Sequence, residues 1–589
     1  MKLKPIFNTL FITFVLAGCA STGTVKLADH SANQNVVDLA PERGTGLTEQ
    51  KLVHADHFMA ASANPLATQA GYDILKRGGS AIDAMIAMQV MLGLVEPQSS
   101  GLGGGAFLVY WDNHAKKLTT FDARETAPKL ATPNLFLDKN GEPLKFMQAV
   151  VGGRSVGTPG VPKLLETVHK RYGKLAWSSL FDYPIRLAEE GFQVSPRLAE
   201  SISQNEEYLK RYPSTAAYFL PKGKPLTSGE ILKNPAFAQS VKLLAKFGST
   251  PFYKGSPAAN IVKAVASATD NPGKLSMADF GQYRVIERQP VCQSYRKYEV
   301  CGMAAPTSGG IALGQILGIL QNHDMKASGA NSLDSWRWLG DASRVAFADR
   351  DFYVGDPAFV TVPDHAMLNS AYLKQRAAEI NSTNKALPEV KAGDLNRKYA
   401  LGKPVELPST SHLVIVDKDG NVVSMTTSIE NAFGSTLMAN GYLLNNELTD
   451  FAFNPAPEGK LVANSVAGGK RPRSSMAPTI VMRNGVPYMA VGSPGGSRII
   501  GYVAKTLVAH IDWGMDIQQA INLPNMLDRG GVYEVEEKTA AAVKAPALEK
   551  LGYKVQVHDL NSGVQGIVIG KDGLTGGADP RREGKVMGD

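Results

Sequence analysis

The 589-residue chain has the composition of an ordinary globular protein, with 44% hydrophobic and 20% charged residues. Its formal net charge of +8 is a mild excess, and no dense Lys/Arg run carries interleaved aromatic residues, which argues against a nucleic-acid-binding protein. No linker rich in Pro and Ser divides the middle of the chain, so we expect one large interwoven unit instead of about three or four separate domains.

The N-terminus is typical of an export signal. Lys2 and Lys4 give it a positive start, residues 7–16 form a short apolar core, and a small-residue stretch follows as far as Cys19. An apolar run of about ten residues is too short to span a bilayer, so we expect residues 1–18 to be a signal peptide that is removed.

The segment that ends at Cys19 resembles the lipobox of bacterial lipoproteins. Acylation of the Cys19 thiol would anchor the mature protein to a membrane, and two or more acyl chains would make the attachment stable. Ala20 in place of Asp favours the outer membrane of a Gram-negative cell, with the protein exported to the periplasmic side. Residues 19–50, polar and without periodicity, predict a flexible tether. The alternative is a soluble secreted protein in which Cys19 is coincidental.

Apolar periodicity predicts a series of helices in the first part of the chain. They are expected at residues 65–75, 80–95, 162–170, 183–191, 196–209, 234–247 and 333–349. The glycine-rich runs 78–79 and 101–105 mark turns, and the aromatic run 107–111 predicts a strand.

Two cysteines, Cys292 and Cys301, flank a short predicted hairpin. If Arg296 and Lys297 form its two-residue loop, the cysteines face each other in a non-hydrogen-bonded pair, where side chains approach most closely. A disulfide is then sterically plausible in an oxidising compartment. Two buried free thiols are the alternative.

Thr410 follows a polar, proline-bearing stretch, residues 385–409, that suits an accessible linker. After it, two alternating apolar runs, 412–416 and 422–428, flank a short turn sequence. The pattern predicts a β-hairpin with a three-residue loop that uses Gly420 at positive φ. With the loop centred on Asp419, Thr410 lies opposite Ser428, and two hydroxyl groups share one site.

The rest of the chain alternates strands with helices. Strands are expected at residues 479–482, 487–491 and 565–569, and helices at 499–511 and 517–523.

Ordered sequence blocks resemble the γ-glutamyltranspeptidase family, also called glutathione hydrolases. The blocks are residues 59–68, 96–105, 122–128, 306–310, 445–450, 470–476 and 492–497. In that family a threonine followed by such a hairpin becomes the first residue of a small subunit when the precursor cleaves itself. The resemblance implies an α+β fold, namely the four-layer αββα fold of N-terminal-nucleophile hydrolases. It also implies cleavage between Ser409 and Thr410 into a large subunit, residues 51–409, and a small catalytic subunit, residues 410–589, which stay together as a heterodimer.

Cleavage before Thr410 would give one residue both a nucleophile and a base. A hydroxyl group is a weak nucleophile at neutral pH, but a free α-amine has a pKa of about 8, so a good fraction is unprotonated and can accept the proton. In the precursor, the Thr410 hydroxyl would attack its own preceding carbonyl to form an ester, which water then opens.

The resemblance assigns the surrounding catalytic positions residue by residue. Ser428 stands where a second threonine is usual in the family, and it keeps a hydroxyl that can hydrogen-bond Thr410. Glu430 occupies a substrate-binding position that is Asn in some members and Glu in others. Gly495 and Gly496 match the oxyanion hole, where backbone N–H groups can approach the substrate closely.

A γ-glutamyl donor carries an α-ammonium and an α-carboxylate group, so its pocket needs opposite charges a few ångströms apart. Glu447 and Asp450 match the family positions that hold the ammonium group. Arg124 matches the arginine that binds the carboxylate, a task suited to its planar fork. Ser474 and Ser475 match the serine pair that completes the carboxylate site.

Other motifs contribute little. Residues 101–106 loosely match a dinucleotide-binding loop, but they lead into an aromatic strand instead of a helix, so that interpretation is rejected. No phosphate loop and no histidine spacing suited to a metal is found, so we expect neither a cofactor nor a metal. His412 is expected to be structural, because the α-amine already fills the role of base.

The sequence therefore predicts a self-cleaving enzyme that forms a γ-glutamyl ester on Thr410. Its substrates would be glutathione and related γ-glutamyl compounds, with water, amino acids or peptides as acceptors. One alternative is a relative specialised for glutaryl-cephalosporins or poly-γ-glutamate, against which the retained Glu447 and Asp450 argue. Another is an uncleaved, surface-anchored binding lipoprotein, against which Thr410, Gly495 and Gly496 argue.

Overall fold

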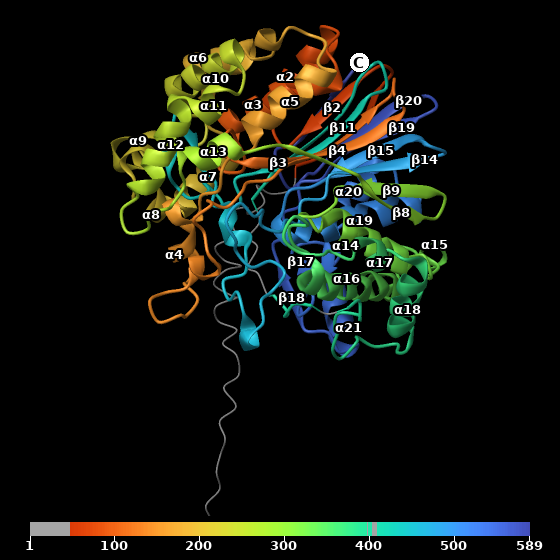
Figure 1. The fold of residues 1–589 in the computed structure, drawn as a ribbon. Coiled ribbons are helices and arrows are strands. Elements are labelled where there is room, and N and C mark those ends of the chain that lie inside the picture. Colours follow the sequence, from red (N-terminus) through yellow and green to blue (C-terminus); the bar gives the residue numbers. More distant parts are fainter. Residues whose placement is uncertain (1–47, 397, 403–408) are drawn as a thin grey trace, which may run out of the picture. The chain divides into compact units, whose positions relative to one another are not determined.

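The computed structural model describes residues 48–396, 398–402 and 409–589 (Figure 1). The predicted signal peptide, Cys19 and all of the predicted tether except residues 48–50 lie outside the described residues. Within the described part, none of the helices combines the length and the apolar character that crossing a bilayer requires.

Two seven-stranded antiparallel sheets form the centre of the fold. The first has the order β1 (Val53–Ala55), β20 (Gly573–Ala578), β19 (Gln565–Gly570), β15 (Val486–Gly492), β14 (Thr479–Arg483), β9 (Tyr298–Gly302) and β8 (Val291–Tyr295). The second has the order β21 (Lys585–Gly588), β2 (Met59–Ser62), β10 (Ser411–Val416), β11 (Val422–Ser428), β3 (Gly105–Asp112), β4 (Lys117–Ala123) and β7 (Ile286–Arg288). Each sheet therefore contains strands from both sides of Thr410.

The two sheets pack face to face around an apolar core that includes Val109, Val414 and Val416 from the second sheet and Ile480 and Ile567 from the first. Helices cover the outer faces. Helices α2 (Pro65–Lys76), α3 (Ala81–Val95) and α5 (Val161–Tyr172) contact the second sheet, and α14 (Gly309–Leu320), α19 (Ile499–Ile511) and α20 (Ile517–Asn522) contact the first (Figure 1). This helix–sheet–sheet–helix order is the αββα architecture, so the predicted α+β fold class is confirmed.

The hairpin predicted around Asp419 forms with the expected register. Ser411 pairs with Thr427, and the same register continued by one residue sets Thr410 opposite Ser428. Gly420 has a φ of 80°, as a short hairpin loop of this kind requires. Strand β10 lies between β2 and β11, so Thr410 immediately precedes a central strand of the sheet.

Helix α3 anchors the loop of this hairpin. Every residue of α3 is buried, which suits a helix that is apolar on all sides. Its N-terminus is closed by a capping box, in which Ser80 and Asp83 each accept a hydrogen bond from the other's backbone N–H. The backbone N–H of Ala81 donates to the Asp417 carboxylate at 2.8 Å, which ties the hairpin loop to the helix.

The remaining elements surround these four layers. The helices are α4 (Phe146–Val150), α6 (Asp182–Glu190), α7 (Pro196–Gln204), α8 (Glu206–Leu209), α9 (Pro213–Phe219), α10 (Pro235–Phe247), α11 (Pro251–Lys254), α12 (Ser256–Ala266), α13 (Met277–Gln282), α15 (Met325–Ser328), α16 (Leu333–Tyr353), α17 (Asp364–Met367), α18 (Ser370–Asn381) and α21 (Ala545–Lys550). Two smaller sheets pair β5 (Phe192–Gln193) with β6 (Ile231–Leu232) and β12 (Met438–Ala439) with β13 (Tyr442–Leu443). A third sheet has the order β16 (Met526–Asp528), β17 (Tyr533–Glu536) and β18 (Val555–His558).

Where the structure differs from the predicted elements, the causes are local. The helix predicted at residues 196–209 is interrupted at Asn205, whose side-chain amide donates to the Ser201 carbonyl at 2.9 Å. Asparagine competes with helical backbone bonding in this way. Helix α14 was not predicted, because four of its twelve residues are glycines, which are weak helix formers.

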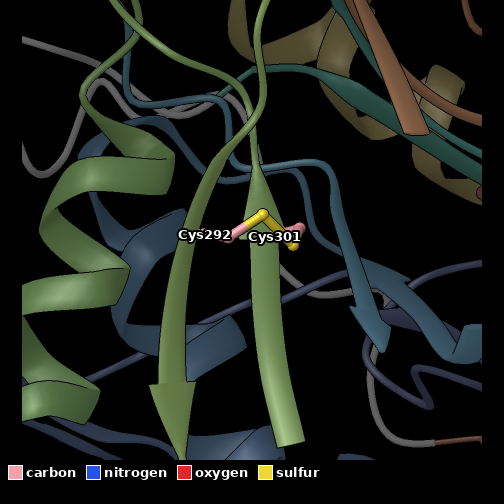
Figure 2. The surroundings of a disulfide bond; sticks show 2 residues. All are labelled: Cys292 and Cys301. Carbon is pink, nitrogen blue, oxygen red and sulfur yellow. A yellow bond between two sulfur atoms is a disulfide. The ribbon is translucent and has the colours of Figure 1, made fainter. Parts of the chain in front are cut away.

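Cys292 and Cys301 face each other across β8 and β9 and form the expected disulfide (Figure 2). Their Cα atoms are 4.1 Å apart, and Tyr295 pairs with Tyr298 around the two-residue loop. Within the described part of the chain, the two sulfur atoms and Glu299 form the one grouping of potential metal ligands that was found, and its sulfur atoms are bonded to each other.

Candidate active site

Thr410 and Ser428 meet at the end of the hairpin, and both are buried. The Thr410 Oγ1 atom lies 3.5 Å from Ser428 Oγ, and it contacts the carbonyl oxygen of Ser409. Ser428 Oγ donates to the same carbonyl oxygen at 3.1 Å and accepts from the Glu430 backbone N–H at 2.8 Å. Two hydroxyl groups thus converge on the carbonyl oxygen of the 409–410 peptide bond.

Arg124 and two acidic side chains form a buried ion cluster beside Thr410. Arg124 follows β4, and its guanidinium group contacts the carboxylates of Glu447 and Asp450, which lie on one 3₁₀ turn, Glu447–Asp450. It also donates to the backbone carbonyls of Pro472 at 3.2 Å and Arg473 at 2.7 Å. A zwitterionic ligand can replace this internal pairing, with its carboxylate on the guanidinium group and its ammonium on the acids.

The electrostatics of this cluster are dominated by burial. Burial works to lower the pKa of Arg124, but Glu447 and Asp450 hold it above its usual range. Burial raises the pKa of Glu430 well above its ordinary value, and Asp450 and Glu447 raise it further. Burial and the charge of Glu447 likewise raise the pKa of Glu125. These carboxyl groups lack enough positive charge to be ionised together, so the site favours a ligand with an ammonium group.

Ser474 and Ser475 are held by the segment that follows β9. The Ser474 N–H donates to the Pro306 carbonyl at 3.1 Å, and the Ser308 hydroxyl donates to the Ser474 carbonyl at 2.7 Å. Arg350, from α16, donates to the hydroxyl of Ser475 at 2.6 Å and to that of Ser308 at 2.8 Å. A buried cation therefore backs the serine pair, which suits a subsite for a carboxylate group.

Gly495 and Gly496 form the turn between β15 and α19. Their φ angles, 132° and 56°, lie in the region that favours glycine, and a Cβ atom on Gly495 would lie 2.8 Å from the Tyr502 ring. Gly496 opens a 3₁₀ turn, Gly496–Arg498, that leads directly into α19. The first N–H groups of a helix have no partner in the helix itself, so this turn can present donors to an oxyanion.

A single pocket, with an empty volume of about 280 Å³, brings these groups together. It is lined by Arg124, Ser409, Thr410, Ser428, Glu430, Glu447, Asp450, Ser474, Ser475, Met476, Gly496 and Ile499. Of the residues assigned to catalysis, substrate binding or cleavage, only Gly495 is not in the lining, and it adjoins Gly496. Cys292 and Cys301 lie elsewhere, on β8 and β9.

Sequence reasoning missed two residues of this site. Glu125 lies directly after Arg124 in a block already quoted for the family, so the signal for a second buried acid was available. Arg350 lies 125 residues before Ser475 on a helix that carries several other charges, and nothing in its local sequence points to the pocket.

His412 has no role in the pocket. It is fully buried on β10, and its Nδ1 atom lies 2.9 Å from Thr426 Oγ1. Burial lowers the pKa of His412 from 6.5 to about 3, so the ring stays neutral at neutral pH. A Cβ atom on Gly492 would lie only 2.2 Å from the ring, so the histidine packs where Gly492 leaves room for it.

The chain is similar in sequence and in fold to known proteins. The family described as Gamma-glutamyltranspeptidase matches residues 67–589. The glutathione hydrolase proenzyme of Bacillus subtilis (strain 168) is 38% identical over 548 residues, which cover 90% of this chain and 91% of the relative. The acylase ACY 1 proenzyme of Pseudomonas sp. (strain SE83) is 34% identical over 549 residues, which cover 91% and 94%. The solved structure of a cephalosporin acylase from Bacillus halodurans is similar with a TM-score of 0.81 and 27% identity, covering 92% of this chain and 97% of that chain.

The lowered pKa of His412 predicts how acid affects stability. Because the folded-state pKa lies below the ordinary value, protonation favours the unfolded chain. The contribution of neutral His412 to the free energy of unfolding is fully present above about pH 6.5 and is lost as the pH falls toward 3. Between pH 7.5 and pH 5 the loss should be about 2 kcal/mol.

Urea unfolding at these two pH values tests this prediction. The variant His412→Gln should lose less stability on acidification than the wild type, whereas His365→Gln, at an exposed histidine, should behave like the wild type. An undiminished acid sensitivity in His412→Gln would contradict the prediction.

Proposed function

The chain belongs to the γ-glutamyltranspeptidase family, and we propose that it cuts itself between Ser409 and Thr410 and then uses Thr410 as the nucleophile of a γ-glutamyltransferase and glutathione hydrolase. One observation carries the proposal. The Thr410 hydroxyl contacts the carbonyl oxygen of the preceding residue, inside a pocket that also holds Arg124 and Asp450.

Self-cleavage would begin with attack by Thr410 Oγ1 on the carbonyl carbon of Ser409. The Ser428 hydroxyl, which donates to that carbonyl oxygen at 3.1 Å, would stabilise the negative charge that develops there. The C–N bond then breaks, the Thr410 nitrogen takes up a proton, and an ester joins Ser409 to Thr410 Oγ1. Water hydrolyses the ester, leaving a carboxylate on Ser409 and a free α-amine on Thr410.

The mature enzyme would use the same hydroxyl on its substrate. The Thr410 α-amine accepts the hydroxyl proton while Oγ1 attacks the γ-carbonyl carbon of the donor. The N–H groups at Gly495 and Gly496 stabilise the oxyanion, and the donor's amide nitrogen leaves as an amine that carries the proton. Water or the amino group of an acceptor then takes the γ-glutamyl group from the ester.

The pocket would bind the α-carbon end of the donor through its charges. Arg124, Ser474 and Ser475 would hold the α-carboxylate, and Glu447 and Asp450, with Glu430 beside them, would hold the α-ammonium group. A glutaryl donor has no ammonium group, so its carboxylate would compete with the buried acids for Arg124 and bring no second cation, and insufficiently paired buried charge is costly. This argues for γ-glutamyl donors, although relatives named as acylases are also similar in sequence and fold.

For the segment before residue 48, we propose cleavage of a signal peptide, acylation of Cys19 and attachment to the outer membrane on its periplasmic side. Support comes from the short apolar core of residues 7–16, from the small residues that lead from it to Cys19, and from Ala20. The disulfide between Cys292 and Cys301 suits an oxidising compartment of this kind.

Replacement of the nucleophile tests the self-cleavage step. Wild-type protein should yield a fragment that begins at Thr410, Thr410→Ala should remain one chain, and Thr410→Ser, which keeps a hydroxyl, should still cleave. Gel electrophoresis with N-terminal sequencing gives the result. Cleavage of Thr410→Ala at the same bond would refute the proposal.

Two chromogenic donors that differ only in the α-amine, γ-glutamyl-4-nitroanilide and glutaryl-4-nitroanilide, test the donor class. We expect kcat/KM to be at least about 100-fold higher for the γ-glutamyl compound, the scale of a buried charge pair. Asp450→Asn should remove most of that preference, and the exposed-site control Asp182→Asn should keep it. Faster release from the glutaryl compound by wild type would favour the acylase alternative.

Fractionation of cells tests the proposed anchor. Wild-type protein should be found with membranes and take up an alkyne-labelled fatty acid. Cys19→Ala should be unlabelled and leave the membrane fraction, while its exported form still cleaves itself. Unlabelled wild-type protein in the soluble fraction would refute the anchor and leave the enzymatic proposal intact.

A further inference from the structure

One loop contacts the residues on both sides of Thr410. This loop, residues 96–100, follows α3. The Ser409 hydroxyl donates to the Gln98 carbonyl at 3.0 Å, and the Ser411 hydroxyl donates to the Glu96 carboxylate at 3.0 Å. Ser100 adds a bond of 3.1 Å to the Ser411 hydroxyl. Each residue that forms these bonds is at most 2% exposed.

The same loop also holds the other end of the hairpin. The backbone N–H of Ile429 donates to the Ser99 carbonyl at 3.2 Å, and that of Phe433 donates to the Gln98 carbonyl at 3.0 Å. Ile429 directly follows Ser428, so the loop fixes the positions of both hydroxyl residues that converge on the Ser409 carbonyl.

Glu96 is itself held by a buried ion pair. Arg197, at the start of α7, donates from Nη1 to Glu96 Oε1 at 2.9 Å, while Oε2 accepts from Ser411. Arginine has only donors, so it fixes Glu96 as an acceptor with its other oxygen directed to Ser411. Both members of the pair are 1% exposed, and hydrogen bonds to a charged group in such a setting are among the stronger ones.

Thr410 lies just outside the paired part of the sheet. The paired part of β10 begins at Ser411, so the ladder between β10 and β11 ends one residue short of the nucleophile. A small rotation of the backbone at Thr410 would move Oγ1 away from the carbonyl it must attack, and errors of about 1 Å in such geometry cost about 100-fold in rate.

We propose that Glu96 is a positioning residue, which acts through Ser411 to hold Thr410 in place for self-cleavage and later for catalysis. The Ser409–Gln98 bond serves only the first of these steps, because Ser409 is no longer attached to Thr410 once the bond is cut. The inference rests on the proposed role of Thr410 as the nucleophile. It predicts an asymmetry between two serines that flank the same bond.

The test compares Ser409→Ala, Ser411→Ala and Glu96→Gln for the rate of self-cleavage of purified precursor and for turnover of γ-glutamyl-4-nitroanilide per cleaved molecule. Ser411→Ala and Glu96→Gln should slow both by roughly 10- to 100-fold, with kcat lowered and KM little changed. Ser409→Ala should slow cleavage far more than turnover. The control is Ser335→Ala in α16, which removes another buried hydroxyl, one that donates to the Gly329 backbone carbonyl at 2.7 Å. This variant should match the wild type in both self-cleavage and turnover.

Two measurements distinguish the possible outcomes: the melting temperature of each variant and the self-cleavage of Thr410→Ala. If Ser411→Ala and Glu96→Gln cleave and turn over at wild-type rates, the positioning role is refuted while the nucleophile stands. A higher KM with an unchanged kcat would also refute the positioning role. So would an equal loss of turnover in Ser409→Ala and Ser411→Ala. If Thr410→Ala cleaves like the wild type, the proposed function itself fails, whatever the other variants do.

Discussion

The register between β10 and β11 is the constraint on which the rest of the site depends. It sets Thr410 opposite Ser428 and brings both hydroxyl groups to the carbonyl of Ser409. A slip of one residue would turn every side chain of the strand to the other face of the sheet. The register is secured by the apolar core between the two sheets, by the loop at Gly420 and by the bond from Ala81 to Asp417. Packing far from the pocket therefore decides whether the chemistry is possible.

The same burial that fixes the geometry also sets the charge of the pocket. Carboxyl groups brought together out of water resist simultaneous ionisation, which the raised pKa of Glu430 reflects. The positive charge of Arg124 compensates for part of this negative charge, and the ammonium group of a ligand would add further positive charge. In the proposed function, a γ-glutamyl donor would relieve this unfavourable electrostatic arrangement and a glutaryl donor would not.

Local sequence was enough to predict the hairpins, their loops and their registers. Turn-forming residues and the alternation of apolar residues along a strand are both recognisable from neighbouring residues. It also located most pocket residues, through blocks that resemble the family. It could not locate Arg350, because the contact with Ser475 depends on how α16 packs against a loop far along the chain. Helix α14 was missed for a different reason, since its four glycines lower the helix propensity of a segment that tertiary packing nevertheless holds in a helix. The sequence did not reveal which residues that are distant along the chain are in contact in the folded protein.

In the proposed reaction sequence, one hydroxyl group, on Thr410, first attacks its own chain and then the substrate. Mass mapping of enzyme quenched by acid during turnover of a γ-glutamyl donor tests this most directly. The quenched enzyme should carry a γ-glutamyl group bound as an ester to a peptide whose first residue is Thr410, with a free α-amine at its end. A γ-glutamyl group on another residue, or an acylated Thr410 still joined to Ser409, would contradict it.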